Sequence, residues 1–171
     1  MHALIVGSRG VGKSTLIERV LRELDRPVTG FITRKEDALG DSVLGVPVYI
    51  YPAGQPRTQS GENLLAYCRG TRPEVYPEAF DRFVPKMCPP QAGGVVVMDE
   101  IGFMESSSEA FRAMILRQLD GETPVLAAVK DRDTPFLNEV RSHPDCRRFD
   151  ITPENRDALY CEVLAFLREQ L

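Results

Sequence analysis

The sequence predicts an α/β fold, a three-layer sandwich in which a mostly parallel β-sheet lies between two layers of helices. Three observations support this prediction. Apolar runs without alternation occupy residues 3–6, 95–98 and 124–129, as expected of strands buried on both faces. Segments with helical apolar periodicity separate these runs. Glycine or charged residues follow each run directly, at the edge where ligands of such sheets bind.

The length and composition indicate one globular domain over residues 1–171. A chain of this size buries about 70% of its unfolded surface around one core. The net charge of −4 provides no electrostatic basis for binding nucleic acid. No apolar run approaches the ~20 residues needed to cross a bilayer, and the first residues do not read as a signal peptide. We therefore expect a cytoplasmic location and no membrane partner.

The first half of the chain predicts a strand, a helix and two further strands. Residues 13–24 carry an apolar stripe of helical period, formed by Leu16, Ile17, Val20, Leu21 and Leu24. Residues 28–33 and 46–51 are rich in β-formers and predict a hairpin or two neighbouring strands, joined by a polar loop at 37–45.

Residues 52–90 are harder to interpret, because they hold seven of the thirteen prolines. We expect short helices at 62–68 and 78–84. The segment either packs structurally or covers a substrate.

The second half shows clear helix starts. Ser106 and Glu109 have the spacing of a capping box and open a helix whose buried face is Phe111, Met114, Ile115 and Leu119. Thr134-Pro135 predicts an N-cap and first helical residue. Residues 148–151 predict a short strand, and Thr152-Pro153 repeats the cap signal before the last helix.

Residues 7–14 match the phosphate-binding pattern G-x-x-x-x-G-K-[ST] completely, between an apolar strand and an amphipathic helix. Glycines let the backbone curl so that N–H groups face phosphates, and the helix adds its positive end. Lys13 is expected to reach the β- and γ-phosphates, Ser14 to bind Mg²⁺, and Thr15 to reach the α-phosphate. The predicted nucleotide-binding residues are Gly7, Ser8, Arg9, Gly10, Val11, Gly12, Lys13, Ser14 and Thr15.

The apolar strand at 95–98 ends in two carboxylates, Asp99 and Glu100, which has the form of a Walker B element. Asp99 is expected to hold Mg²⁺ opposite Ser14, because a carboxylate at a buried strand end is costly unless paired or metal-bound. Glu100 is the candidate general base for a water that attacks the γ-phosphate. Glu105 is a second candidate for this catalytic role.

Phosphoryl transfer also calls for a cation at the γ-phosphate. The sequence leaves several candidates open: Arg9, Lys130, Arg132, Arg147, Arg148 and Arg156. The guanine-specific pattern N-K-x-D is not met, since residues 129–132 read V-K-D-R. Strict GTP specificity by that route is therefore not expected.

Beyond the phosphate-binding loop, four segments resemble the cancer-related and thermophile-type nucleoside-triphosphatases, a family of small P-loop proteins. They are residues 29–34 (T-G-F-I-T-R), 99–105 (D-E-I-G-F-M-E), 108–111, and 152–157 (T-P-E-N-R-D). The resemblance spans nearly the whole chain apart from residues 52–90. It departs in the phosphate-binding loop, which lacks the family's usual proline, and after Thr33, where the chain reads R-K-E.

The resemblance implies a P-loop NTPase fold and slow, broad-specificity hydrolysis of nucleoside triphosphates with Mg²⁺. It also draws attention to Glu105, and to Asn155 and Arg156 as nucleotide-binding residues, although helix capping is an independent explanation for Asn155. Two alternatives stay open: a small-molecule kinase with a basic lid over residues 130–148, and a nucleotide-gated switch or accessory protein.

Overall fold

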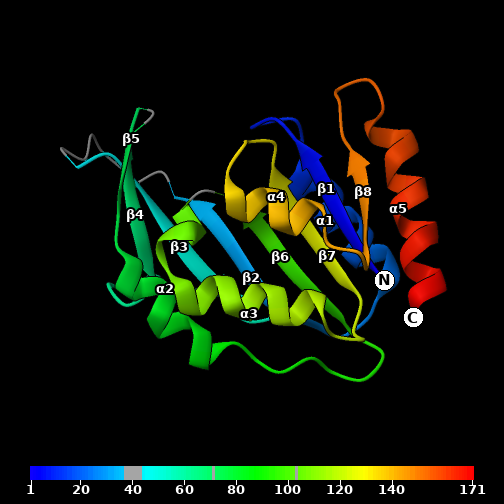
Figure 1. Ribbon diagram of the computed structural model, residues 1–171, viewed down its shortest axis with the longest axis horizontal. Helices are drawn as coiled ribbons and strands as arrows, with labels where there is room; N and C mark the ends of the chain where they lie inside the picture. The colour runs from blue at the N-terminus through cyan, green and yellow to red at the C-terminus, as the bar shows by residue number, and fades with distance from the viewer. Residues whose placement is uncertain (37–43, 71, 103) are drawn as a thin grey trace.

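The computed structural model of the protein describes residues 1–36, 44–70, 72–102 and 104–171. Within these residues one eight-stranded sheet forms the middle layer, and helices cover both of its faces (Figure 1). The predicted three-layer α/β sandwich is thus confirmed. Most of the predicted polar loop at 37–45 falls outside the described residues.

The elements follow the predicted alternation of strands and helices. The strands are β1 (His2–Gly7), β2 (Val28–Lys35), β3 (Val46–Pro52), β4 (Leu64–Arg69), β5 (Arg72–Val75), β6 (Val95–Ile101), β7 (Val125–Lys130) and β8 (Cys146–Asp150). The helices are α1 (Lys13–Leu24), α2 (Pro77–Phe83), α3 (Glu109–Leu119), α4 (Pro135–Arg141) and α5 (Arg156–Gln170), with short 3-10 helices η1 (Val84–Lys86) and η2 (Met104–Ser107).

The sheet has two parts, in the order β5-β4-β3-β2-β6-β7-β1-β8. Strands β2, β6, β7, β1 and β8 pair in parallel, and we call them the parallel half. Strands β3, β4 and β5 pair antiparallel beyond β2 and form the antiparallel extension. The carboxyl ends of all parallel strands therefore meet at one edge, to which their arrowheads point in Figure 1.

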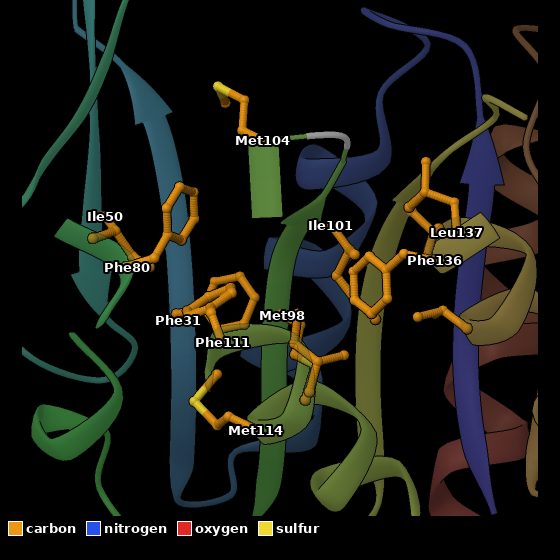
Figure 2. Close-up of a cluster of buried hydrophobic side chains, with 14 of the residues drawn as sticks. Phe31, Ile50, Phe80, Met98, Ile101, Met104, Phe111, Met114, Phe136 and Leu137 are labelled. Atoms are coloured by element: carbon orange, nitrogen blue, oxygen red, sulfur yellow. The ribbon is translucent and has the colours of Figure 1, made fainter. Parts of the chain in front are cut away.

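Each face of the sheet has its own apolar core. On one face, α2, α3 and α4 pack over the strands. There Phe111 lies between Phe31 and Phe80, with ring centroids 4.9 Å apart in each pair (Figure 2). On the other face, α1 and α5 bury the apolar stripes predicted for both helices, including Ile17 and Val163. The two cores together hold the strands of the parallel half in place, and with them the carboxyl edge of the sheet.

One predicted helix is wrong. Residues 62–68 contain strand β4, which pairs with β3 on one side and β5 on the other. Leu65 and Ala66 are fully buried, and the backbone hydrogen bonds of two neighbouring strands outweigh the local helix propensity. The helix predicted at 78–84 is confirmed as α2 and is followed by η1.

The helix starts also differ in detail. Ser108, not Ser106, caps α3: its Oγ accepts a hydrogen bond from the Phe111 N–H at 3.0 Å, because Ser106 already belongs to η2. Thr134 caps α4 as predicted, accepting from the Leu137 N–H at 3.2 Å. Thr152 does not cap α5. A turn separates them, and the helix begins at Arg156.

Among the described residues, no helix is both long and apolar enough to span a membrane.

Candidate active site

The phosphate-binding loop connects β1 to α1 at the carboxyl edge of the parallel half. Gly10 and Gly12 have φ angles of +77° and +108°, a region that favours glycine. Gly7 is required for a different reason, since a Cβ there would lie 2.9 Å from the carbonyl oxygen of Ile151. The backbone thus curls as the pattern predicts, against the turn that follows β8.

Lys13 lies inside this curl. Its Nζ donates hydrogen bonds to the carbonyl oxygens of Gly7 at 2.9 Å and Ser8 at 2.8 Å. Only 4% of the residue is exposed, and this burial lowers the pKa of the ammonium group, against the opposing effect of Glu100. The ammonium is therefore a buried cation that points into the loop where phosphates would bind.

The structure brings Ser14 and Asp99 together from positions 85 residues apart. The Ser14 hydroxyl, in the first turn of α1, donates to Asp99 Oδ1 at 2.8 Å. Asp99 lies in β6 and is 1% exposed, and burial raises the pKa of its carboxyl group. An adjacent hydroxyl and carboxylate are the hard oxygen donors that Mg²⁺ accepts, so these residues fit the predicted metal site.

Sequence reasoning assigned no role to Arg34, although the side chain lies directly at this site. The Arg34 guanidinium donates from Nη1 to Asp99 Oδ2 at 2.7 Å and from Nη2 to Glu18 Oε1 at 3.0 Å. Arg34 is near the carboxyl end of β2, which pairs in parallel with β6. Its position after an apolar strand was the available signal, but the neighbour of that strand was not known.

Glu100 is held between two cations. Its Oε1 lies 2.8 Å from Lys130 Nζ, and its Oε2 lies 4.0 Å from Lys13 Nζ. Its backbone N–H donates to the Thr33 hydroxyl at 3.1 Å, which ties the end of β6 to β2. Of the cations that the sequence left open, Lys130 is thus the one placed beside the candidate base.

A pocket of about 200 Å³ opens at these residues. Four cationic side chains line it, those of Arg9, Arg34, Lys35 and Lys130, together with Ser14, Thr33, Val48, Glu100 and Met104. A strongly basic pocket next to a phosphate-binding loop suits an anionic group such as the end of a triphosphate.

A second pocket, of about 340 Å³, borders the end of the loop at Gly12. Its walls come from the start of α1, with Gly12, Thr15, Leu16 and Arg19, and from the turn and start of α5, with Pro153, Glu154, Arg156, Asp157 and Tyr160. The Arg19 guanidinium stacks 3.9 Å above the Tyr160 ring and binds Asp157 at 3.0 Å. Sequence reasoning did not single out this stacked pair.

The two residues drawn from the C-terminal motif behave differently. Arg156 lines the second pocket close to Gly12. Asn155 instead holds the turn before α5: its Nδ2 donates to the Asp150 carbonyl, and its Oδ1 accepts from the Thr152 N–H, both at 2.8 Å. Its assignment to nucleotide binding stays a prediction, and its observed contacts are structural.

Other candidates make different contacts, or have side chains that the structure does not describe. Arg148 is paired with Asp150, and Arg147 stacks on Phe149 and Phe166. Glu105 lies in η2, but its side chain is outside what the structure describes. Its catalytic role stays a prediction.

The chain is similar in sequence and in fold to known nucleoside-triphosphatases. A family model described as NTPase matches residues 2–164. The chain is 32% identical to nucleoside-triphosphatase THEP1 of Pyrococcus abyssi, covering 100% of this chain and 94% of that protein. It is 28% identical to the cancer-related nucleoside-triphosphatase homolog of Mus musculus, covering 98% and 96%. The crystal structure of THEP1 from Aquifex aeolicus superposes with a TM-score of 0.70 at 25% identity, covering 98% of this chain and 99% of that one.

Proposed function

The chain belongs to the NTPase family, and from this premise we propose that it hydrolyses nucleoside triphosphates to diphosphates and phosphate, with Mg²⁺ as cofactor. The observation that carries the proposal is the convergence of Lys13, the Ser14–Asp99 pair and Glu100 at one edge of the sheet. These are the groups that hydrolysis needs: a cation that binds the phosphates, ligands for the metal and a general base.

Phosphate binding falls to the loop of residues 7–14 and to Lys13. In the nucleotide-free arrangement the Lys13 ammonium is held by two carbonyl oxygens. Phosphate oxygens are charged acceptors and make stronger hydrogen bonds than neutral carbonyls, so an entering triphosphate is a better partner. Lys13 then donates to the β- and γ-phosphates.

Ser14 and Asp99 would hold the metal, which when bound neutralises charge on the β- and γ-phosphates. The carboxylate side of this pair comes from β6 and the hydroxyl side from α1. Because both elements are anchored in the core, their oxygens are positioned before the ligand arrives.

Glu100 is the proposed base. Its carboxylate accepts a proton from a water molecule while the water oxygen attacks the γ-phosphorus and the bond to the β–γ bridging oxygen breaks. Lys130, 2.8 Å from Glu100, would stabilise the negative charge that develops on the γ-phosphate oxygens.

The second pocket is the proposed site of the nucleoside. Thr15 and Arg156 border it next to the loop, where the α-phosphate would lie. The Arg19–Tyr160 stack offers a flat surface, and every base has a face that stacks. This supports hydrolysis of several nucleoside triphosphates rather than one.

We propose that residues 1–171 act as one domain, since one continuous sheet carries both cores and both pockets. The cytoplasmic location also belongs to the proposal.

The direct test is release of phosphate by the purified protein from ATP, GTP, CTP and UTP, with no acceptor added. We expect release from each nucleotide with Mg²⁺ and none after EDTA. Release only after an acceptor is added would indicate a kinase. Tight nucleotide binding without measurable turnover would indicate a switch, and either result would overturn the proposal.

A further inference from the structure

The Arg34 guanidinium contacts the Asp99 carboxylate, and there it competes with the expected metal ion. Both carboxylate oxygens of Asp99 are already used: Oδ1 accepts from Ser14 at 2.8 Å and Oδ2 accepts from Arg34 at 2.7 Å. The guanidinium also donates to the Thr33 carbonyl at 2.9 Å and to Glu18 at 3.0 Å. A cation that approaches Asp99 from this side meets a cation already in place.

The arrangement has an energetic reason. A carboxylate that is 1% exposed is strongly destabilised unless it is paired, and Arg34 is the ion-pair partner of Asp99. A guanidinium suits this task because its planar fork can bind two oxygens at once and is easier to desolvate than an ammonium group. Arg34 therefore stabilises the folded protein in the absence of other ligands.

The same side chain also lines the basic pocket, beside Arg9 and Lys130. A phosphate in that pocket would offer the guanidinium a second anionic partner of the kind it binds in bidentate fashion. Glu18 does not hold it firmly in place, because the Glu18 side chain is 51% exposed and a pair of this kind contributes little. If the Arg34 guanidinium leaves Asp99 for a phosphate, it therefore keeps the same number of ion pairs.

We propose that Arg34 is an exchangeable counter-ion for Asp99. It blocks the metal site in the nucleotide-free protein and moves to the triphosphate when metal and nucleotide enter together. The inference rests on the proposed function for the identity of the incoming anion. Its consequence is an order of events: the free protein binds divalent cations weakly, and nucleotide binding releases the site.

In the first test the nucleotide-free protein is titrated with Mn²⁺, and electron paramagnetic resonance measures how much Mn²⁺ is bound. Arg34→Met should bind Mn²⁺ roughly tenfold more tightly than the wild type, within the usual range for coupled sites. Arg168→Met is the matched control, since Arg168 also pairs with a carboxylate, Glu23 at 3.2 Å, but on the surface between α1 and α5. It should leave the Mn²⁺ affinity unchanged.

The variant Lys130→Met distinguishes two explanations: that Arg34 blocks the metal site at Asp99, or that any positive charge in the pocket repels Mn²⁺. Lys130 lines the same pocket and pairs with Glu100 rather than Asp99. A tightening in Arg34→Met that clearly exceeds that in Lys130→Met supports displacement at Asp99. Equal tightening in both variants, or none in Arg34→Met, overturns the proposal.

The second measurement follows the wild-type protein, and the conservative variant Arg34→Lys serves only to assign the Arg34 resonances. Nitrogen-15 spectra of the arginine guanidinium groups, with Arg34 assigned through its loss in Arg34→Lys, are recorded with a non-hydrolysable triphosphate and Mg²⁺. The Arg34 resonances should shift strongly with both ligands together and little with Mg²⁺ alone. No shift with both ligands overturns the proposal, while phosphate release by the same preparation shows separately whether the hydrolase function holds.

Discussion

The parallel half of the sheet and the antiparallel extension differ in where their charged side chains form ion pairs. Strands β1 and β7 are buried along nearly their whole length, and largely buried ion pairs lie at the carboxyl edge of the parallel half. There Asp99 is paired with Arg34, and Glu100 with Lys130. Beside the extension, the ion pair between Glu62, in the turn before β4, and Lys86, in η1, is more than half exposed at both partners and lies at the surface.

This difference supports the carboxyl edge of the parallel half as the place of the proposed hydrolysis. Parallel strands bring residues from distant parts of the chain to one edge, where burial strengthens every charge interaction. Antiparallel strands β3, β4 and β5 join neighbours in sequence and enlarge the core instead. Substitutions that remove a charge should therefore affect turnover in the parallel half and almost nothing in the extension.

The largest effect is expected from Lys13→Ala. Loss of the buried ammonium removes both phosphate binding and stabilisation of the transition state, so kcat/KM should fall on the order of 10⁴-fold. Lys86→Ala, in η1 beside the extension, is the matched control and should keep wild-type kinetics. Comparable losses in the two variants would contradict the division between the two regions.

Glu100→Gln should lower kcat by about 10²–10⁴-fold, the usual result of removing a general base, and leave nucleotide affinity nearly unchanged. Calorimetry with a non-hydrolysable triphosphate measures the affinity. Glu74→Gln, at an exposed position of β5, provides the comparison and should be kinetically silent. Unchanged turnover in Glu100→Gln would transfer the role of base to Glu105.

Leu65→Ala tests the opposite case, because this substitution in the extension should lower the stability of the protein and leave kcat unchanged. Leu65 is fully buried in β4, and such truncations lower the free energy of unfolding by about 2–5 kcal/mol. Denaturant unfolding gives this value, and kcat of the folded protein at low temperature should match the wild type. A large fall in kcat there would mean that the extension takes part in catalysis.

Tyr160→Leu should have the smallest effect of the four. Removal of the stacking surface costs about 1 kcal/mol per base, and KM should rise roughly fivefold for every nucleotide alike. Tyr67→Leu, which removes half of an edge-to-face pair with Tyr76 in the extension, is the control. An increase in KM for only one base would show that the second pocket discriminates between bases.

Much of the fold follows from local patterns. The apolar strands β1, β6 and β7, the stripe of α1 and the Thr134 cap of α4 each depend on residues within a few positions of one another. The helix predicted at 62–68 is strand β4, because this stretch gains its preference for a strand only from pairing with two neighbouring strands. Ser108 was missed as a cap for a similar reason, since η2 intervenes before α3.

The sequence by itself determined the groups that we propose to bind and react: the glycines of the loop, Lys13, Ser14 and the carboxylates that end β6. Their spacing is local, and the backbone conformations they need are set by the residue types. Only the tertiary structure decided which charges meet. Arg34 lies 65 residues from Asp99, and nothing in either segment states that β2 pairs with β6. That pairing is a property of the whole packed sheet, and it placed an arginine on the carboxylate expected to bind the metal.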